Sequence, residues 1–417
     1  MELKSSDNGQ PRNPGDLDRT FATDGRIEIS ERGTANAITS DQNGNLYLVS
    51  QIGDRFRLSR YFVDGAKDER FVETTWNFED GDQSRPMRLL LQDGKILVIG
   101  ESLKAGVLRP AVARFNASGS PDLVFGRKVI KTGPEDATPN QFSYKFVDGC
   151  LQKDQKILLS TAYTLQSGRP LARLFRLQAT GESDNNFGEG QGFIDITFHD
   201  RDSYANDVQI QSNGSIIVAG SWRYDGEQQR TRTVARYTVE GVLDNTFGRA
   251  GYADIFVPEE QLEKLQITAL LMDEIVSRVA VQDDDKIIIA GYAKGSDGLR
   301  NGLLARLERD GDIDNDFNQG KPLLISRSLN DLAFHSLAIQ PDGKIVAVGK
   351  GTMAGVTMEL YERVSEKGEI DRFSAGHSVG DCTDVTIQPE GRVVISGSSG
   401  TSAVGARYPR VWGRQGR

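Results

Sequence analysis

The chain has 417 residues, 37% of them hydrophobic, and a formal net charge of −9. That charge argues against a nucleic-acid surface, which needs a basic patch, and gives no attraction to an anionic membrane. No stretch approaches about 18 apolar residues, so membrane insertion is not expected, and the polar N-terminus lacks the apolar run of a secretory signal. We therefore expect a cytoplasmic protein, or one exported without a signal peptide.

The first 14 residues are polar and contain Pro11 and Pro14, which predicts a disordered tail. From residue 15 onward the chain repeats itself with a period of about 58 residues. The clearest phrase in the repeat is a polar turn with glycine that leads into an apolar run, as in residues 340–349. Such a turn between two β-rich runs is typical of a hairpin. The phrase occurs seven times, beginning at Gln42, Gln92, Gln152, Gln211, Gln282, Gln340 and Gln388.

A second phrase, Gly-x-x-Asp-x-x-Phe, also occurs seven times, although the last copy is one residue short. Its aspartates are Asp18, Asp68, Asp122, Asp184, Asp244, Asp314 and Asp371. A short strand with an arginine near its end precedes most copies, with Arg60, Arg114, Arg176, Arg236, Arg306 and Arg363 at this position. One unit is therefore strand A, tight turn, strand B, loop, strand C with arginine, Asp–Phe turn, strand D. Four short antiparallel strands per unit are typical of a propeller blade.

The two ends of the chain predict how the ring closes. The chain opens with an Asp–Phe turn and a strand D, and it ends with strands A, B and C but no such turn. We therefore predict an all-β, seven-bladed β-propeller in which the N-terminal segment supplies the outer strand of the last blade, leaving no exposed sheet edges at the closure. The propeller would be one domain over residues 15–412. The expected blades are at about residues 35–76, 84–132, 143–198, 203–257, 276–326, 333–379, and 381–412 with 17–30.

These phrases resemble the delta-60 repeat of bacterial propeller-like proteins, over about residues 15–408. Its motifs are matched well by residues 243–248 and by residues 340–349. The resemblance implies a propeller but no particular reaction, because fold alone does not give function.

Features that recur in every blade are expected to be structural. We expect each Asp of the second phrase to bind local backbone amides and the column arginine, and each Phe to fill the space between blades. Arg407 would then pair with Asp18 across the closure. The acidic run at 310–316 lacks the glycine and glutamate spacing of an EF-hand, and is expected to be a solvated turn, as are residues 283–285.

Function is expected where the blades differ. The D–A and B–C connections vary in length and lie on one face, which we call the loop face. An insert at residues 258–275 looks helical, and would either pack on a blade or act as a lid. The candidate binding residues of the loop face are Trp222, Arg223, Tyr224, Arg230, Arg232, Trp76 and Tyr292. Aromatic and cationic side chains in one loop suit stacking on a sugar or gripping an acidic partner.

A further polar column lies four residues before the glutamine of each strand A, except in blade 1, where slack is allowed and Asn36 lies six residues before Gln42. Its members are Asn36, Arg88, Asp148, Asp207, Arg278, Ser336 and Asp384. If strand A is innermost, these side chains ring the mouth of the central channel. We expect ion pairing of Arg88 with Asp148 and of Asp207 with Arg278. The alternative is capture of a polar ligand or a cation; Asp148, Asp207 and Asp384 would then be the metal ligands, with calcium as the ion.

No zinc, P-loop or nucleophile-elbow motif is present in the sequence. We therefore expect a non-catalytic binding or scaffold protein without a cofactor, which presents its loop face to a protein or glycan partner. The alternative is a metal-dependent lactonase or hydrolase with its site at the channel mouth. The oligomeric state does not follow from the sequence.

Overall fold

The structure is a computed structural model that describes residues 16–79, 83–134, 147–223, 230–258, 275–294, 299–326, 330–370, 379–400 and 407–414. The tail, Tyr224, residues 259–274 of the insert, and Asp371 of the seventh Asp–Phe turn lie outside these ranges. The described residues form strands and two 3-10 turns, η1 (Phe198–Asp200) and η2 (Asn318–Gly320), with no α-helix. Accordingly, no described helix is long and apolar enough to cross a membrane.

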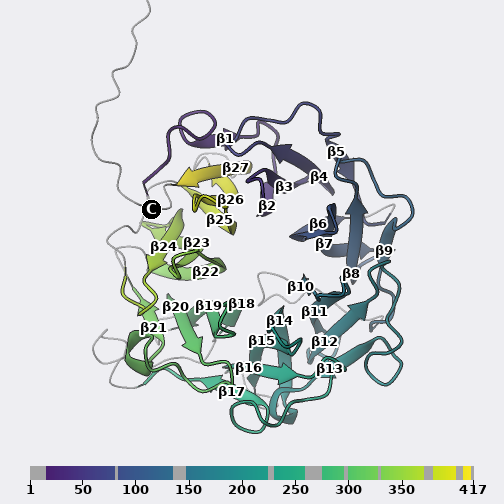
Figure 1. The fold of residues 1–417 in the computed structure, drawn as a ribbon, viewed down its shortest axis with the longest axis vertical. Coiled ribbons are helices and arrows are strands. Elements are labelled where there is room, and N and C mark those ends of the chain that lie inside the picture. Colours follow the sequence, from purple (N-terminus) through teal and green to yellow (C-terminus); the bar gives the residue numbers. More distant parts are fainter. Residues whose placement is uncertain are drawn as a thin grey trace, which may run out of the picture.

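The strands form seven antiparallel sheets arranged as the blades of a ring (Figure 1), which confirms the predicted seven-bladed β-propeller with four strands per blade. From the axis outward, the strands of blades 1 to 3 are β2 (Thr34–Ser40), β3 (Leu46–Ile52), β4 (Arg55–Tyr61), β5 (Thr74–Trp76); β6 (Ser84–Gln92), β7 (Lys95–Lys104), β8 (Val107–Phe115), β9 (Arg127–Val129); β10 (Val147–Leu151), β11 (Ile157–Thr164), β12 (Pro170–Leu177), β13 (Phe193–Ile196).

Blades 4 and 5 follow the same order, and blade 6 has three strands within the described residues. Their strands are β14 (Asp202–Ile210), β15 (Ile216–Arg223), β16 (Thr231–Tyr237), β17 (Tyr252–Ile255); β18 (Ile275–Val281), β19 (Ile287–Lys294), β20 (Arg300–Leu307), β21 (Leu323–Ile325); β22 (Asn330–Ile339), β23 (Ile345–Met353), β24 (Val356–Val364). A bridge between Met358 and Val379 lies beside β24, on the side where the other blades have their outer strand.

Blade 7 is made from both ends of the ring. Its strands are β25 (Gly380–Ile387), β26 (Val393–Gly400), β27 (Arg407–Arg414) and, outermost, β1 (Arg26–Glu28). In β1, Ile27 pairs with Val411 of β27 in antiparallel register. Figure 1 shows β1, in purple, beside the yellow strands of the C-terminal segment. The predicted closure by the N-terminal segment is therefore confirmed.

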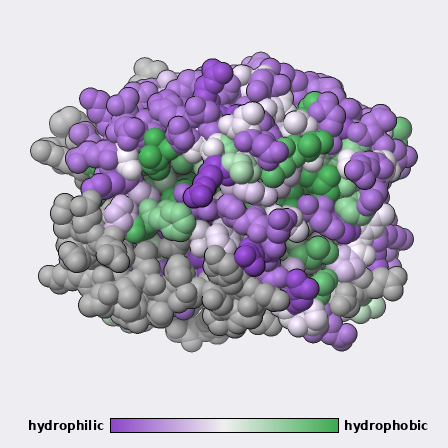
Figure 2. Space-filling model, turned by 90° about the horizontal axis from the view of Figure 1, so that it is seen from below, coloured by the Kyte–Doolittle hydropathy of each residue, from purple (hydrophilic) through white to green (hydrophobic). Residues whose placement is uncertain are grey.

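The hydrophobic core lies between the blades. Each of seven buried clusters joins two successive blades, and one of them joins blade 7 to blade 1 across the closure. Cys150 and Cys382 are buried free thiols within two of these clusters. Seen edge-on, the described surface is mostly hydrophilic with small separate apolar patches (Figure 2). Isolated apolar patches of this kind are normal for a folded domain.

The repeated columns join each blade to the next. The Nε atom of Arg236 donates to Asp244 at 2.7 Å, and its NH1 atom donates to the Arg309 carbonyl of the next blade at 2.9 Å. The guanidinium therefore bridges two blades, and does not grip the carboxylate with both of its arms. Phe187 packs against the turn glycine of blade 4, Gly241, where an added Cβ would lie 2.7 Å from the ring. Because Gly241 also has a φ of +88°, this position excludes other residues on two grounds.

The expected partner of Asp18 was wrong. Asp18 pairs with Arg392, whereas Arg407 lies opposite Gly400 at the far end of β27 from Arg414, which bridges to Leu17. The position of Arg407 along its strand therefore places it away from Asp18.

Candidate functional site

The polar column of the innermost strands is largely buried, and one of its expected members does not belong to it. In blade 1, the register shifts between Ala35 and Ala37, so Asn36 is the extra residue of a β-bulge. The residue after the equivalent bulge in blade 2 is Arg88, and Ala37 takes that place in blade 1. Asn36 instead accepts a hydrogen bond from the amide of Gln51. The prediction for Asn36 was wrong because Asp41 takes the place of the strand A glutamine in blade 1. The amide of Asp41 donates to the Asn45 carbonyl, as the amide of Gln152 donates to the Lys156 carbonyl in blade 3, and the fourth residue before Asp41 is Ala37.

Arg278 lies at the centre of this ring. Its NH1 atom is 2.5 Å from Asp148 of blade 3, and its NH2 atom is 2.8 Å from Asp384 of blade 7. Ser336 accepts from the same guanidinium at 3.2 Å and donates to Asp384 at 2.6 Å. Asp207 of blade 4 lies 3.8 Å away. One side chain from blade 5 thus reaches across the axis to the blades two places away on either side.

Arg88 supplies the second cation of this cluster. Its Nε atom is 3.7 Å from Asp148, and its NH1 atom is 3.9 Å from Asp384. The predicted pairs of Arg88 with Asp148 and of Arg278 with Asp207 are both present, but the shortest contacts of Arg278 are with Asp148 and Asp384. Because this cluster is formed by residues from blades 2 to 7, we call it the channel plug.

Burial and neighbouring charges shift the pKa values of two groups in the channel plug, Asp207 and Arg278. Burial raises the pKa of Asp207 to about 7, and the nearby charge of Asp148 acts in the same direction. Burial would lower the pKa of Arg278, but Asp148, Asp384 and Asp207 together hold it above its usual value. Asp207 also accepts the amide of Val279 at 2.8 Å, which ties blade 4 to blade 5. Three carboxylates thus share two guanidinium groups, and burial makes Asp207 hold a proton more readily than a solvated carboxyl does.

The three carboxylates proposed as metal ligands are already bound to a cation of the chain itself. The Arg278 guanidinium lies among Asp148, Asp207 and Asp384, where a metal ion would otherwise sit. Across the residues that the structure describes, no group of three or more acidic, histidine or cysteine side chains is arranged to hold a metal. The arrangement therefore fits an internal salt bridge.

The expected binding residues of blade 4 are largely buried. Trp222 is 9% exposed, and its Nε1 atom donates to Asp254 at 3.1 Å. Arg232 is fully buried and donates to the carbonyl of Tyr292 at 3.2 Å. Arg230 is also buried, and its guanidinium lies 3.9 Å from the centre of the Tyr204 ring. These groups hold strands together, and the Trp222 ring offers little surface for stacking.

The remaining candidates lie in blades 4, 1 and 5. Arg223, at the end of β15 in blade 4, lies 3.6 Å from Asp202 of β14 in the same blade. Trp76, half-buried in blade 1, lies under the guanidinium of Arg127, at 5.3 Å from its ring centre. The ring of Tyr292 in blade 5 is covered in the same way by Arg300. The structure thus brings Trp222, Arg230 and Arg232 together in blade 4, and places Trp76 in a different blade.

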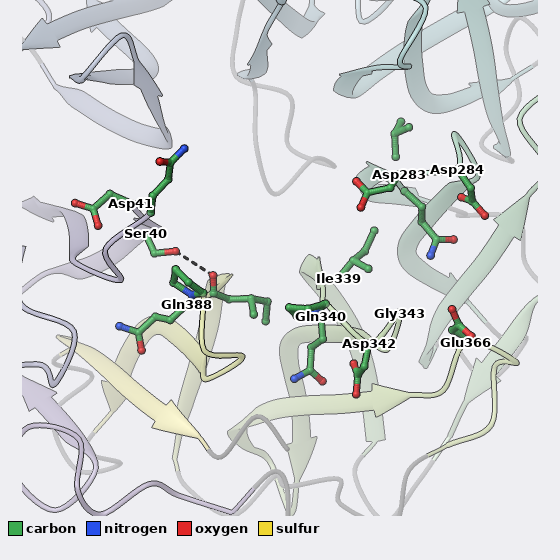
Figure 3. A pocket seen from close by; sticks show the side chains of 16 residues that line it. Ser40, Asp41, Asp283, Asp284, Ile339, Gln340, Asp342, Gly343, Glu366 and Gln388 are labelled. Carbon is green, nitrogen blue, oxygen red and sulfur yellow. Dashed lines mark hydrogen bonds between the residues drawn. The ribbon is translucent and has the colours of Figure 1, made fainter.

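The face of the ring that carries the A–B and C–D turns lies opposite the loop face, and we call it the turn face. An acidic cavity on the turn face was not predicted. It has a volume of about 880 Å³ and is lined by the A–B turns of blades 1, 5, 6 and 7. Figure 3 shows Asp41, Asp283 and Asp342 on turns of three different blades around this cavity. The signal in the sequence is the acidic residue in several A–B turns, of which only residues 283–285 are assigned in the sequence analysis, to a solvated turn.

Comparisons with known proteins support the repeat and the fold. Three segments, residues 91–125, 211–247 and 282–317, match the family described as "Domain of unknown function (DUF5122) beta-propeller". Each segment runs from the end of strand A to the Phe of the Asp–Phe turn, so each contains both repeated phrases. These three repeats are therefore similar to those of a known β-propeller family. No curated protein sequence matches the chain.

Solved structures with a similar fold include several lyases. The polysaccharide lyase Uly1 has a TM-score of 0.54 at 10% identity, over 99% of this chain and 96% of its own. A PL25 ulvan lyase has a TM-score of 0.52 at 10% identity, over 92% and 95%. A streptogramin B lyase has a TM-score of 0.50 at 12% identity, over 93% and 96%. At such identities the likeness shows the propeller fold alone.

Proposed function

We propose that this protein is a non-catalytic binding propeller that presents its loop face to a protein partner. The observation that carries the proposal is a difference between the two faces of the ring: contacts between successive blades lie at the turn face, and connections of variable length lie at the loop face. The column contacts, such as that of Arg236 with Asp244 and Arg309, lie at the turn face and hold successive blades together. The repeated side chains of the turn face are thus engaged in contacts between blades, whereas the connections of the loop face differ from blade to blade.

The length of these connections supports the proposal. In blades 1, 2 and 6, strands B and C are joined by two-residue hairpins, at Gly53–Asp54, Ala105–Gly106 and Ala354–Gly355, whereas five residues join them in blade 3. A rigid ring with loops of different length on one face is a common arrangement for recognising a partner. A protein partner is favoured over a glycan, because the ring of Trp222, the best candidate for stacking on a sugar, is buried.

The enzyme alternative has less support. A hydrolase at the channel mouth would need carboxylates that are free to act on a substrate, but Asp148 and Asp384 are engaged by Arg278. The lyases with a similar fold share 10 to 12% of their residues with this chain, which is too little to carry over their reactions.

Site-specific photo-crosslinking tests the proposal. A photoreactive amino acid at Ser167 would probe the B–C connection of blade 3, and one at Asn213 would probe the A–B turn of blade 4. Both residues are exposed, and each accepts a hydrogen bond from the amide two residues later, so they are matched. In cells that make the protein, we expect a cross-linked partner from position 167 and none from position 213. A cross-link from position 213 alone, or from neither position, would overturn the proposal.

A further inference from the structure

The acidic cavity of the turn face has apolar side chains in its wall. Its lining includes Val281, Ile339 and Ile387, which are the last residues of the innermost strands β18, β22 and β25. Each of the three is half-buried and packs against a core cluster with only part of its surface, so the remainder faces the cavity. The volume of about 880 Å³ lies within the range of small-molecule sites, which is about 300–1,000 Å³.

The charges around these apolar side chains are all of one sign. The charged residues in the described lining are the carboxylates Asp41, Asp283, Asp284, Asp342 and Glu366. Asp342 pairs with Lys344 of its own turn at 2.8 Å, whereas Asp283 and Glu366, both exposed, form no ion pair with any described residue. A hollow lined by one sign of charge raises the local concentration of counter-ions. The cavity therefore attracts cations.

The lysines of other A–B turns do not neutralise the cavity. In blades 2, 3 and 5, the lysine of this turn pairs with the Asp of the second repeated phrase, which belongs to the C–D turn of the same blade. The pairs are Lys95 with Asp122 at 2.6 Å, Lys156 with Asp184 at 3.4 Å, and Lys286 with Asp314 at 2.9 Å. None of these lysines is part of the cavity lining. The carboxylates that do line it thus keep their charge available for a ligand.

The combination of apolar and acidic lining selects an organic cation. Within the described part of the chain, no group of three or more acidic, histidine or cysteine side chains is arranged to hold a metal. An aliphatic polyamine carries several ammonium groups joined by methylene segments, so it can meet carboxylates and aliphatic side chains at once. We propose that the acidic cavity binds a polyamine of the spermidine class, with ammonium groups on Asp283 and Glu366 and a methylene segment over Ile339.

The proposal goes beyond the loop-face function, because it concerns the opposite face and a small ligand. It is tested by calorimetric titration of the full-length protein with spermidine and with hexaamminecobalt(III), which carries the same charge but no methylene groups. We expect one spermidine to bind per ring, about tenfold more tightly than hexaamminecobalt(III), because methylene groups are buried on the apolar side chains.

Two double variants locate the site. Asp283→Asn with Glu366→Gln removes two carboxylates of the cavity and should weaken spermidine binding about tenfold. Asp93→Asn with Glu240→Gln removes the same charges from turns of blades 2 and 4 that lie outside the cavity lining, and should bind spermidine as the unaltered protein does. All four side chains are exposed, so both variants are expected to fold.

Three results would each overturn the proposal. The first is that spermidine does not bind, and the second is that the two double variants bind it equally tightly. The third is that hexaamminecobalt(III) binds as tightly as spermidine, since charge alone would then account for the binding. None of these outcomes bears on cross-linking of a protein partner at the loop face.

Discussion

The Nε atom of Arg392 lies 2.9 Å from a carboxylate oxygen of Asp18, a residue 374 positions earlier in the chain. The NH1 atom of the same arginine donates to the carbonyl of Val63 in blade 1. Arg392 thus makes both contacts that a column arginine makes in the other blades, but from the A–B turn.

The column position itself is taken by glycine in blade 7. Gly413 pairs with Val394, as Arg236 pairs with Ile217 in blade 4. A Cβ atom at Gly413 would lie 2.4 Å from the Phe21 side chain, so the ring of Phe21 fills this place. The closure therefore keeps the same contacts with a different residue.

We expect Asp18→Ala to lower the free energy of unfolding by about 1–3 kcal/mol, because it removes the charged partner of Arg392 and the acceptor for Thr20. Urea denaturation followed by circular dichroism would measure this. Glu69→Ala, an exposed residue in the corresponding turn of blade 1, should have little effect. Equal midpoints for the two variants would contradict the role of Asp18 in closure.

Arg278→Met should be more damaging. It would leave Asp148 and Asp384 buried without their main cation, and breaking a buried ion pair on one side costs about 3–5 kcal/mol. Adding Asp148→Asn and Asp384→Asn to Arg278→Met should restore part of the loss, because the uncompensated charges are removed. If Arg278→Met unfolds at the same urea concentration as the unaltered protein, the channel plug does not stabilise the ring.

The raised pKa of Asp207 predicts a pH dependence. Its folded pKa of about 7 lies above the unfolded value of about 3.9, so the folded state holds the proton more tightly. The contribution of Asp207 to stability is therefore full below about pH 4 and is lost as the pH rises to about 7. We expect Asp207→Asn to gain stability relative to the unaltered protein between these limits, and urea titrations at several pH values would measure the difference.

Comparing Asp207→Asn with the unaltered protein separates the effect of Asp207 on stability from the effects of the other carboxylates. Burial would raise the pKa of Asp122, but Lys95 and Arg114 lower it to about 2, and this opposite dependence is shared by both proteins. A stability difference that does not change with pH would show that Asp207 is ionised throughout.

Trp222→Ala should lower the free energy of unfolding by about 3–5 kcal/mol, since the ring is buried and its Nε1 atom is bonded to Asp254. Below the melting transition, cross-linking from position 167 should be unchanged. Lost cross-linking in a variant of normal stability would instead make Trp222 a binding residue.

The repeated phrases predicted the ring because each is a local signal: a glycine turn, an alternating run, an Asp that caps its own turn. The roles of Arg392 and Gly413 could not be predicted. Arg392 makes the contacts of a column arginine, and Gly413 leaves room for Phe21 at the column position, only when blade 7 is assembled from both chain ends. An arginine at the turn position where Lys95 and Lys286 stand in other blades was the available signal.

The sequence predicted most of the residues that form the channel plug, but it did not predict which of them make contact across the channel. Counting placed Arg278 in the ring, but its contacts with Asp148 and Asp384 depend on the width of the channel, which strand patterns do not encode.

The pairing of Arg392 with Asp18 has a consequence for the chain as it leaves the ribosome. At about 5–20 residues per second, the 374 positions between them take roughly 20 to 75 s to synthesise. Through that interval β1 has no neighbour to hydrogen-bond with, and its unsatisfied edge is open to other nascent chains. A chaperone that shields residues 16–31 early in translation would therefore raise the yield of closed rings.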